Sequence, residues 1–380
     1  MTRPVRCGAA ALVICAVAAL LAPRSARADS TSVAAPEWLS EIALHGFLSS
    51  SYSYNFNRPN SATNTYRVFD FDDNTFKLDV FELVALKPAV RPRESGVRVD
   101  VTMGSSIPRV TASSGLFRDA SGTAEDFDLQ QAFASYIAPI GSGLRLDLGK
   151  FVTHSGYEVI DGFDGWNDNA SRSILFGYAI PFTHTGLRAS YALSSKAAIM
   201  GMVVNGWDVA RDNNKSKSLG GQLALTPDAV LSVFLNATWG PERNGNDSDD
   251  RTLLDAVVLV KDARGRSFGI NGDWAREEWS TDPVHPTHRW MGIAAYVRAP
   301  LTPSFALIVR GESFDDREGD RTGLEQTLWE WTVTPELRLT PHMILRADVR
   351  GDRSNRSVFE KRSSLVDSQT TVLIDALYAF

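Results

Sequence analysis

One short stretch of the chain has the spacing of a serine nucleophile. Residues 265–269 read G-x-S-x-G around Ser267. A hydrolase of this kind holds the serine on a turn between a strand and a helix, with a histidine and an acid to activate it. Here the stretch leaves a tight turn and enters an alternating segment, and of the six histidines only His285 and His288 are close together. We therefore predict that the protein is not an enzyme, and a hydrolase is the weaker alternative.

A second group of candidate side chains lies in the longest polar segment, residues 152–184. Carboxylates in a confined space raise the local concentration of cations, and aromatic side chains in a loop need a surface on which to pack. We hypothesise that this segment folds inward as a constriction loop; the alternative is an outer loop that packs on its neighbours. The candidate residues are Glu158, Asp161, Asp164, Trp166, Asp168 and Arg172.

A calcium loop is suggested by the spacing of Asp70, Asp72 and Asn74. Thr75 stands where such a loop needs glycine, and Phe81 stands where it needs a bidentate acid. We therefore predict neither a metal site nor a cofactor.

Most of the remaining charged residues alternate with apolar ones. Leu144, Leu146 and Leu148, for example, alternate with Arg145 and Asp147. A period of two indicates a strand with one polar and one apolar face. The polar phase of the clear strands carries seven positive and eight negative charges, nearly balanced, and most are expected to brace neighbouring strands. They are Lys77, Arg98, Arg145, Arg310, Arg338, Arg346, Arg350, Asp79, Asp100, Asp147, Glu312, Glu330, Glu336, Asp348 and Asp375.

The turns give the number of these strands. The phrase L-T-P recurs at 225–227, 301–303 and 339–341, and further tight turns fit at four other places, giving seven. Eight longer polar connections alternate with them, at 56–75, 105–125, 152–184, 206–216, 241–251, 277–287, 315–323 and 353–367. We therefore predict about sixteen strands. Glu82 falls on the apolar phase of its strand, which suggests a β-bulge nearby.

Alternation alone does not separate a soluble sandwich from a membrane barrel. In a sandwich the apolar face covers a core, whereas in an outer-membrane barrel it faces lipid. Short turns alternating with long loops are typical of the barrel. The predicted fold is an all-β, transmembrane, antiparallel, up-and-down barrel, with short periplasmic turns and long extracellular loops.

The start of the chain predicts export. Arginines precede an apolar run, and an A-x-A site ends at Ala28, which is the pattern of a cleaved signal peptide. We expect residues 1–28 to be removed, 29–40 to form a short periplasmic tail, and 41–380 to form the barrel. Both cysteines, Cys7 and Cys15, lie in the removed segment, which also takes four basic residues and no acid. The mature net charge of −10 argues against a nucleic-acid partner.

The end of the chain is an alternating strand that stops on an aromatic residue. Ile374, Tyr378 and Phe380 share the apolar phase. Because a barrel closes on itself, we expect this strand to pair with the first one, near Ile42. Such an aromatic end resembles the signal that the barrel-assembly machinery reads.

Two stretches also resemble a known family. "SYSYNFNRPNSATNTYRVFDFDDNTFKLDVFELVALKPA", residues 51–89, and "GYEVIDGFDGWNDNASRSILFGYAIPFTHTGLRASY", residues 156–191, resemble the OmpL-like β-barrel porins. The resemblance implies a barrel channel and says little about the solute. It implies no catalytic or binding residues.

These observations together predict a porin in the outer membrane of a Gram-negative bacterium. Its water-filled channel would pass small hydrophilic solutes or ions by diffusion, with a mild cation preference. The expected partners are outer-membrane lipids, the assembly machinery, the solutes and other copies of the chain. A non-conducting barrel that serves as an adhesin or structural protein is the main alternative, ahead of a barrel-embedded hydrolase.

Overall fold

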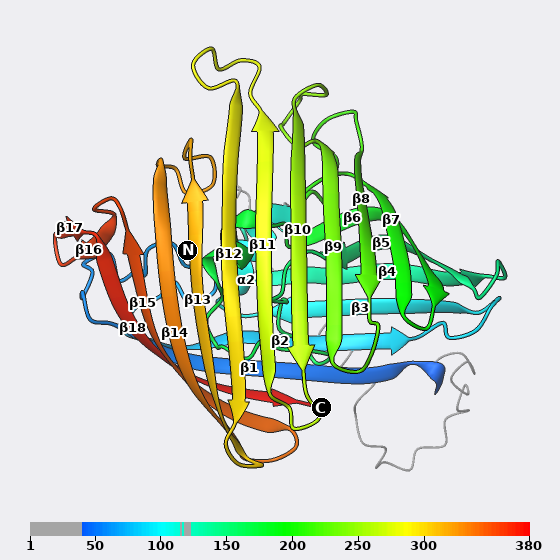
Figure 1. The fold of residues 1–380 in the computed structure, drawn as a ribbon, viewed down its shortest axis with the longest axis horizontal. Coiled ribbons are helices and arrows are strands. Elements are labelled where there is room, and N and C mark those ends of the chain that lie inside the picture. The colour runs from blue at the N-terminus through cyan, green and yellow to red at the C-terminus, as the bar shows by residue number, and fades with distance from the viewer. Residues whose placement is uncertain (1–39, 115, 118–122) are drawn as a thin grey trace, which may run out of the picture. The chain divides into compact units, whose positions relative to one another are not determined.

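A computed structural model describes residues 40–114, 116–117 and 123–380. The predicted signal peptide and all but the last residue of the predicted tail lie outside the described residues. Residues 43–380 form one compact unit, a closed barrel of sixteen antiparallel strands (Figure 1). The strands are β1 (Ala43–Asn55), β2 (Thr75–Lys87), β3 (Ser95–Met103), β4 (Phe127–Ala138), β5 (Leu144–Val152), β6 (Thr183–Ser194), β7 (Ala197–Val204), β8 (Ser218–Leu225), β9 (Leu231–Pro241), β10 (Asp250–Lys261), β11 (Ser267–Glu278), β12 (Thr287–Pro300), β13 (Phe305–Asp316), β14 (Gln326–Arg338), β15 (Met343–Ser354) and β18 (Ser368–Ala379).

The barrel closes where its first strand meets its last. Figure 1 shows β1 in blue beside β18 in red, with Phe47 opposite Ala379 in the ladder. The backbones of Gly46 and Phe380 exchange two hydrogen bonds of 2.9 Å. The predicted fold class, the strand count and the pairing of the two ends are therefore confirmed.

The connections alternate in length, as the sequence predicted. The seven short turns are 88–94, 139–143, 195–196, 226–230, 262–266, 301–304 and 339–342, and every connection between them is longer. Three of the long connections hold structure of their own that the sequence did not predict. These elements are α2 (Ile107–Ser114), the π-helix η2 (Leu175–Ala179), and a hairpin of β16 (Phe359–Lys361) and β17 (Ser364–Val366).

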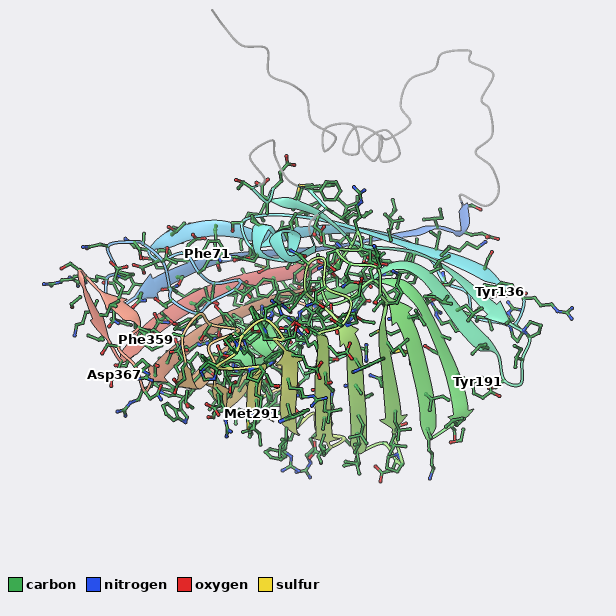
Figure 2. All side chains as sticks on the ribbon, turned by 90° about the horizontal axis from the view of Figure 1, so that it is seen from above. Phe71, Tyr136, Tyr191, Met291, Phe359 and Asp367 are labelled. Atoms are coloured by element: carbon green, nitrogen blue, oxygen red, sulfur yellow. The ribbon has the colours of Figure 1, made fainter. Side chains whose placement is uncertain are left out.

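The outward face of the strands is apolar and exposed, as lipid contact requires. Aromatic residues lie toward both ends of the strands, and Figure 2 shows Tyr136 and Tyr191 on the outside of the wall near the short turns. Trp239 and Trp329 are exposed near the long loops. Among the described residues, no helix is long and apolar enough to cross a membrane.

The inward face carries the polar phase and, unexpectedly, an apolar core. The register of β1 and β2 slips at Ser49 and Ser50, so that Asp79 is an extra residue on β2. This bulge turns Glu82 inward, where it is buried, and confirms the irregularity that the sequence suggested. The core inside the barrel is built around Leu175 and Trp290.

Candidate functional site

The connection between β5 and β6, residues 153–182, lies inside the barrel, where inward carboxylates of the wall accept its backbone hydrogen bonds. Glu82 of β2 accepts a bond of 2.8 Å from the amide of Phe163. Asp348 of β15 accepts one of 2.7 Å from the amide of Ser171, and Asp255 of β10 accepts one of 3.1 Å from Gly156. Because these strands lie on different sides of the barrel, the segment crosses the bore. We call it the inner loop.

Arg310 of β13 is the most completely buried anchor of the inner loop, with no exposed surface. One terminal nitrogen donates to Glu158 at 2.8 Å and to the carbonyl oxygen of Ser171 at 2.7 Å. Its Nε donates to Glu330 of β14 at 3.1 Å. A charge buried this deeply is stable only when it is fully paired and hydrogen-bonded. Arg310 therefore depends on acceptors from both the inner loop and the wall.

Two further arginines of β15 hold the same loop. Arg346 is paired with Asp375 of β18 at 2.6 Å and also donates to the carbonyl oxygen of Asn169 at 3.2 Å. Arg350 is paired with Asp352 at 2.8 Å and donates to the carbonyl oxygen of Arg172. These charges therefore fasten the inner loop to the wall.

Each of the four carboxylates predicted to line the constriction is paired with an arginine. Besides Glu158, Asp161 pairs with Arg172 of the same loop at 2.8 Å. Asp164 pairs with Arg98 of β3 at 2.6 Å, and Asp168 with Arg298 of β12 at 2.7 Å. Burial raises the pKa of Asp168, and Arg298 opposes that rise. Trp166 packs beside Phe47, with ring centroids 6.4 Å apart.

The apolar part of the inner loop fills one side of the bore. The helix η2 packs on β11 and β12, where Leu175 lies so close to Gly292 that a Cβ there would meet its Cδ1 at 2.6 Å. The indole of Trp290 donates to the carbonyl oxygen of Ala179 at 3.1 Å. Phe314 and Leu328 complete this core from β13 and β14, with no exposed surface.

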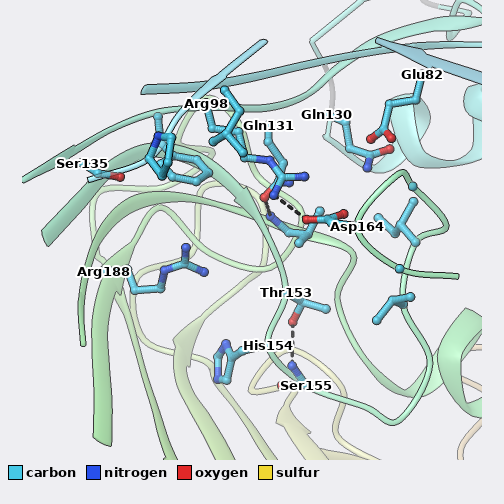
Figure 3. Close-up of a pocket in the computed structure, with 18 of the residues that line it drawn as sticks. Glu82, Arg98, Gln130, Gln131, Ser135, Thr153, His154, Ser155, Asp164 and Arg188 are labelled. Atoms are coloured by element: carbon cyan, nitrogen blue, oxygen red, sulfur yellow. Dashed lines mark hydrogen bonds and ion pairs between the residues drawn. The ribbon is translucent and has the colours of Figure 1, made fainter. Parts of the chain in front are cut away.

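The other side of the bore is open. A cavity of about 540 Å³ lies between the inner loop and strands β2 to β6. Figure 3 shows side chains from both sides pointing into it. The strands contribute Glu82, Arg98, Gln130, Gln131, Ser135, Arg145 and Arg188, and the loop contributes Thr153, His154, Ser155, Glu158 and Asp164.

Two arginines of the cavity wall share one acid. Asp147 of β5 accepts from Nε of Arg145 at 2.9 Å and from a terminal nitrogen of Arg188 on β6 at 3.0 Å. Ser135 of β4 donates to the same carboxylate at 2.6 Å. Both carboxylate oxygens of Asp147 therefore accept hydrogen bonds from these wall residues.

His154 lies beside His184, with ring centroids 6.1 Å apart. Burial, together with the neighbouring His184 and Arg188, lowers the pKa of His154 to about 3. The imidazole is therefore neutral at pH 7 and adds no charge to the cavity. In the sequence these two histidines are separated by the whole inner loop, so their proximity was missed.

The predicted wall residues fall into three groups in the structure. Arg98, Asp100, Arg145 and Asp147 lie at the open cavity or directly behind it. Lys77 and Asp79 form an ion pair of 3.3 Å beneath the connection 56–74. Apart from Arg338, which is only partly buried, the remaining residues are almost fully buried. Three of them are acids paired with arginines: Glu330 with Arg310, Glu336 with Arg298 and Asp375 with Arg346. The other five contact the inner loop: Arg310, Glu312, Arg346, Asp348 and Arg350.

Arg188, Arg298 and Gln130 are site residues that the sequence reasoning missed. Arg188 alternates with Leu187 and Ala189, so the same period-two rule could have found it. Gln130 was hidden by a bulge, because β4 has this one extra residue opposite β3.

At the chain's end, Ile374, Tyr378 and Phe380 are all about half exposed, on the outward face. Among the described residues, no group of three or more His, Asp or Glu is placed to hold a metal ion.

Several solved structures share this fold. An anion-selective porin from Comamonas acidovorans is 11% identical, with a TM-score of 0.60, and the match covers 89% of this chain and 99% of that one. The outer-membrane channel DcaP of Acinetobacter baumannii is 10% identical, with a TM-score of 0.60, covering 89% and 97%. OprB of Pseudomonas putida is 10% identical, with a TM-score of 0.58, covering 90% and 96%. At these identities the likeness establishes the fold alone.

The family comparison goes further. None of the curated proteins matches this sequence. A family model, described as "Putative beta-barrel porin-2, OmpL-like", matches residues 41–380, which is the whole barrel. The match also covers both stretches that resemble this family in the sequence. The chain therefore belongs to the OmpL-like β-barrel porin-2 family.

Proposed function

We propose that this protein is an outer-membrane porin through which small hydrophilic solutes diffuse passively along strands β2 to β6. The observation that carries the proposal is the cavity of about 540 Å³ between these strands and the inner loop, inside a closed barrel. The opposite side of the bore is filled by the apolar core around Trp290. The path is therefore eccentric, and the inner loop sets its width.

The exterior and the comparisons support this proposal. An apolar outer face with aromatic residues near both ends suits outer-membrane lipid. The family to which the chain belongs is one of porins, and the solved structures that share its fold include a porin described as anion-selective and an outer-membrane channel. Removal of residues 1–28 on export, recognition of Phe380 by the assembly machinery, and association with other copies of the chain remain part of the proposal.

A cation preference was expected from the carboxylates of the inner loop. It requires that those carboxylates act on the channel unopposed, but each of them is paired with an arginine. The pairs leave little net field from the loop. We therefore propose the loop as a constriction that acts by its size and position, and the charge preference is better sought on the wall.

Swelling of liposomes that contain the refolded mature chain tests the channel directly. Sugars of increasing size should enter at rates that fall steeply with size. A variant lacking residues 160–170 should admit larger sugars, whereas a shorter deletion within the outer connection 279–286 should not. A folded barrel that admits no sugar would overturn the proposal and favour an adhesin or a structural barrel.

A further inference from the structure

We propose that Arg145 and Arg188 form a contact site for the carboxylate group of small monoanionic solutes in the cavity. The inference deepens the proposed function, because it assigns a class of solute to the channel. It rests on the charge balance, the exposure and the fixed orientation of these two side chains.

The charge balance leaves one positive charge. Arg145 and Arg188 both pair with Asp147, at 2.9 and 3.0 Å. Within the described part of the chain, neither arginine has a second acidic partner. Two guanidinium groups over one carboxylate therefore match a solute with a single negative charge better than one with two.

Because the three side chains differ in exposure, a solute in the cavity can contact the surplus positive charge. The side chains of Arg145 and Arg188 are 38% and 21% exposed, whereas that of Asp147 is 1% exposed. A solute in the cavity thus meets the guanidinium groups and not the acid behind them. Figure 3 shows Arg188 pointing into the cavity.

Both arginines are held in place before a solute arrives. The guanidinium of Arg188 lies over the ring of Phe151 at 4.5 Å and that of Phe133 at 5.8 Å. Arg145 donates to the hydroxyl of Ser135 at 3.0 Å. A guanidinium with fixed orientation binds a planar carboxylate through two donors at little entropic cost.

The other charges at the cavity nearly balance one another. Arg98 pairs with both Asp100 and Asp164, which leaves one negative charge, and Lys87 of β2 adds a cationic side chain to the lining. Glu158 is paired with Arg310, and Glu82 is buried and accepts from the inner loop. The volume of about 540 Å³ limits the solute to a small organic anion.

Reversal potentials across a planar bilayer test the inference. The wild-type protein in a KCl gradient should pass chloride in preference to potassium. Arg188→Gln or Arg145→Gln should lower that ratio roughly fivefold, because a unit charge about 4 Å away changes the local ion concentration by about that factor. Asp147→Asn should raise the ratio, and Arg264→Gln in the exposed turn 262–266 should leave it unchanged.

A conservative variant separates charge from carboxylate recognition. Arg188→Lys keeps the charge but loses the planar pair of donors, so the chloride preference should persist. Acetate should reduce the chloride current through the wild type by occupying the site, and it should do so much less through this variant.

The outcomes separate the two proposals. A folded barrel without conductance would overturn the channel itself. A conducting channel with no chloride preference, or with a preference that Arg188→Gln, Arg145→Gln and Asp147→Asn all leave unchanged, would overturn only the carboxylate site. Opposite shifts in the arginine and aspartate variants would support it, even if one of the two arginine variants failed to fold.

Discussion

Replacing Arg310 by methionine should detach one end of the inner loop while leaving the barrel closed. The guanidinium is fully buried and bonded to Glu158 of the loop, to Glu330 of the wall and to the carbonyl oxygen of Ser171. Methionine fills much of the volume but offers no donor. The two glutamates would then be left without this buried partner.

The size of the effect follows from burial. Breaking a buried ion pair by removing one partner costs about 3 to 5 kcal/mol, since the remaining charge stays desolvated. We expect a loss of that size in the free energy of unfolding, measured by urea titration of the protein in lipid vesicles. We also expect larger and noisier current steps, because a loosened loop constricts the channel less.

Two controls sharpen this test. Arg338 shares the inward phase of β14, and no ion pair to it is found among the described residues, so Arg338→Met should cost little. Adding Glu158→Gln to Arg310→Met should recover part of the loss, because it removes one stranded charge. Unchanged stability and unchanged conductance in Arg310→Met would refute the view that buried pairs hold the loop in the bore.

Three further predictions follow from other contacts. Gly46→Leu should lower the yield of folded barrel, seen as heat-modifiable mobility on gels, because a Cβ at that position would lie 2.2 Å from the ring of Phe380. Gly292→Val should push Leu175 and its loop away from β12 toward the open cavity and lower the conductance, because its Cβ would lie 2.6 Å from that side chain. Asp208 lies in the connection 205–217, and burial raises its pKa from 3.8 to about 6. A raised carboxyl pKa disfavours the ionised folded form, so stability should fall by about 3 kcal/mol as the pH rises through that window. Asp208→Asn should remove this slope in urea titrations at pH 4 and pH 8.

The barrel could be predicted from the sequence because its signals are local. A period of two marks each strand, and the L-T-P turns mark its ends. The exposed aromatic end at Phe380 is explained by closure onto Gly46. The sequence also indicated the β-bulge in β2, because Glu82 falls on the apolar phase of its strand. It did not identify Asp79 as the extra residue.

The interior was harder to predict because it depends on contacts between distant residues. The inner loop was recognised by its length and its acids, but nothing in the sequence links Glu158 to Arg310, 152 residues away. These charges were therefore expected to line a water-filled channel. In the structure, Arg310 and Arg350 are instead buried against the inner loop. The apolar core inside the bore was missed, since it breaks the rule that barrel interiors are polar.

The central claim is that solutes pass between the inner loop and strands β2 to β6. Both cysteines lie within residues 1–28, so a chain produced without those residues contains no cysteine, and a single one can be introduced at a chosen position. Thr153 lines the open cavity, whereas Thr332 lies on the filled side with no exposed surface. Single-channel current should therefore fall when a bulky thiol reagent reacts with the cysteine of the Thr153→Cys variant. The same reagent should leave the current of the Thr332→Cys variant unchanged. Block at Thr332→Cys alone, or no current from the folded barrel before any reagent is added, would contradict the account.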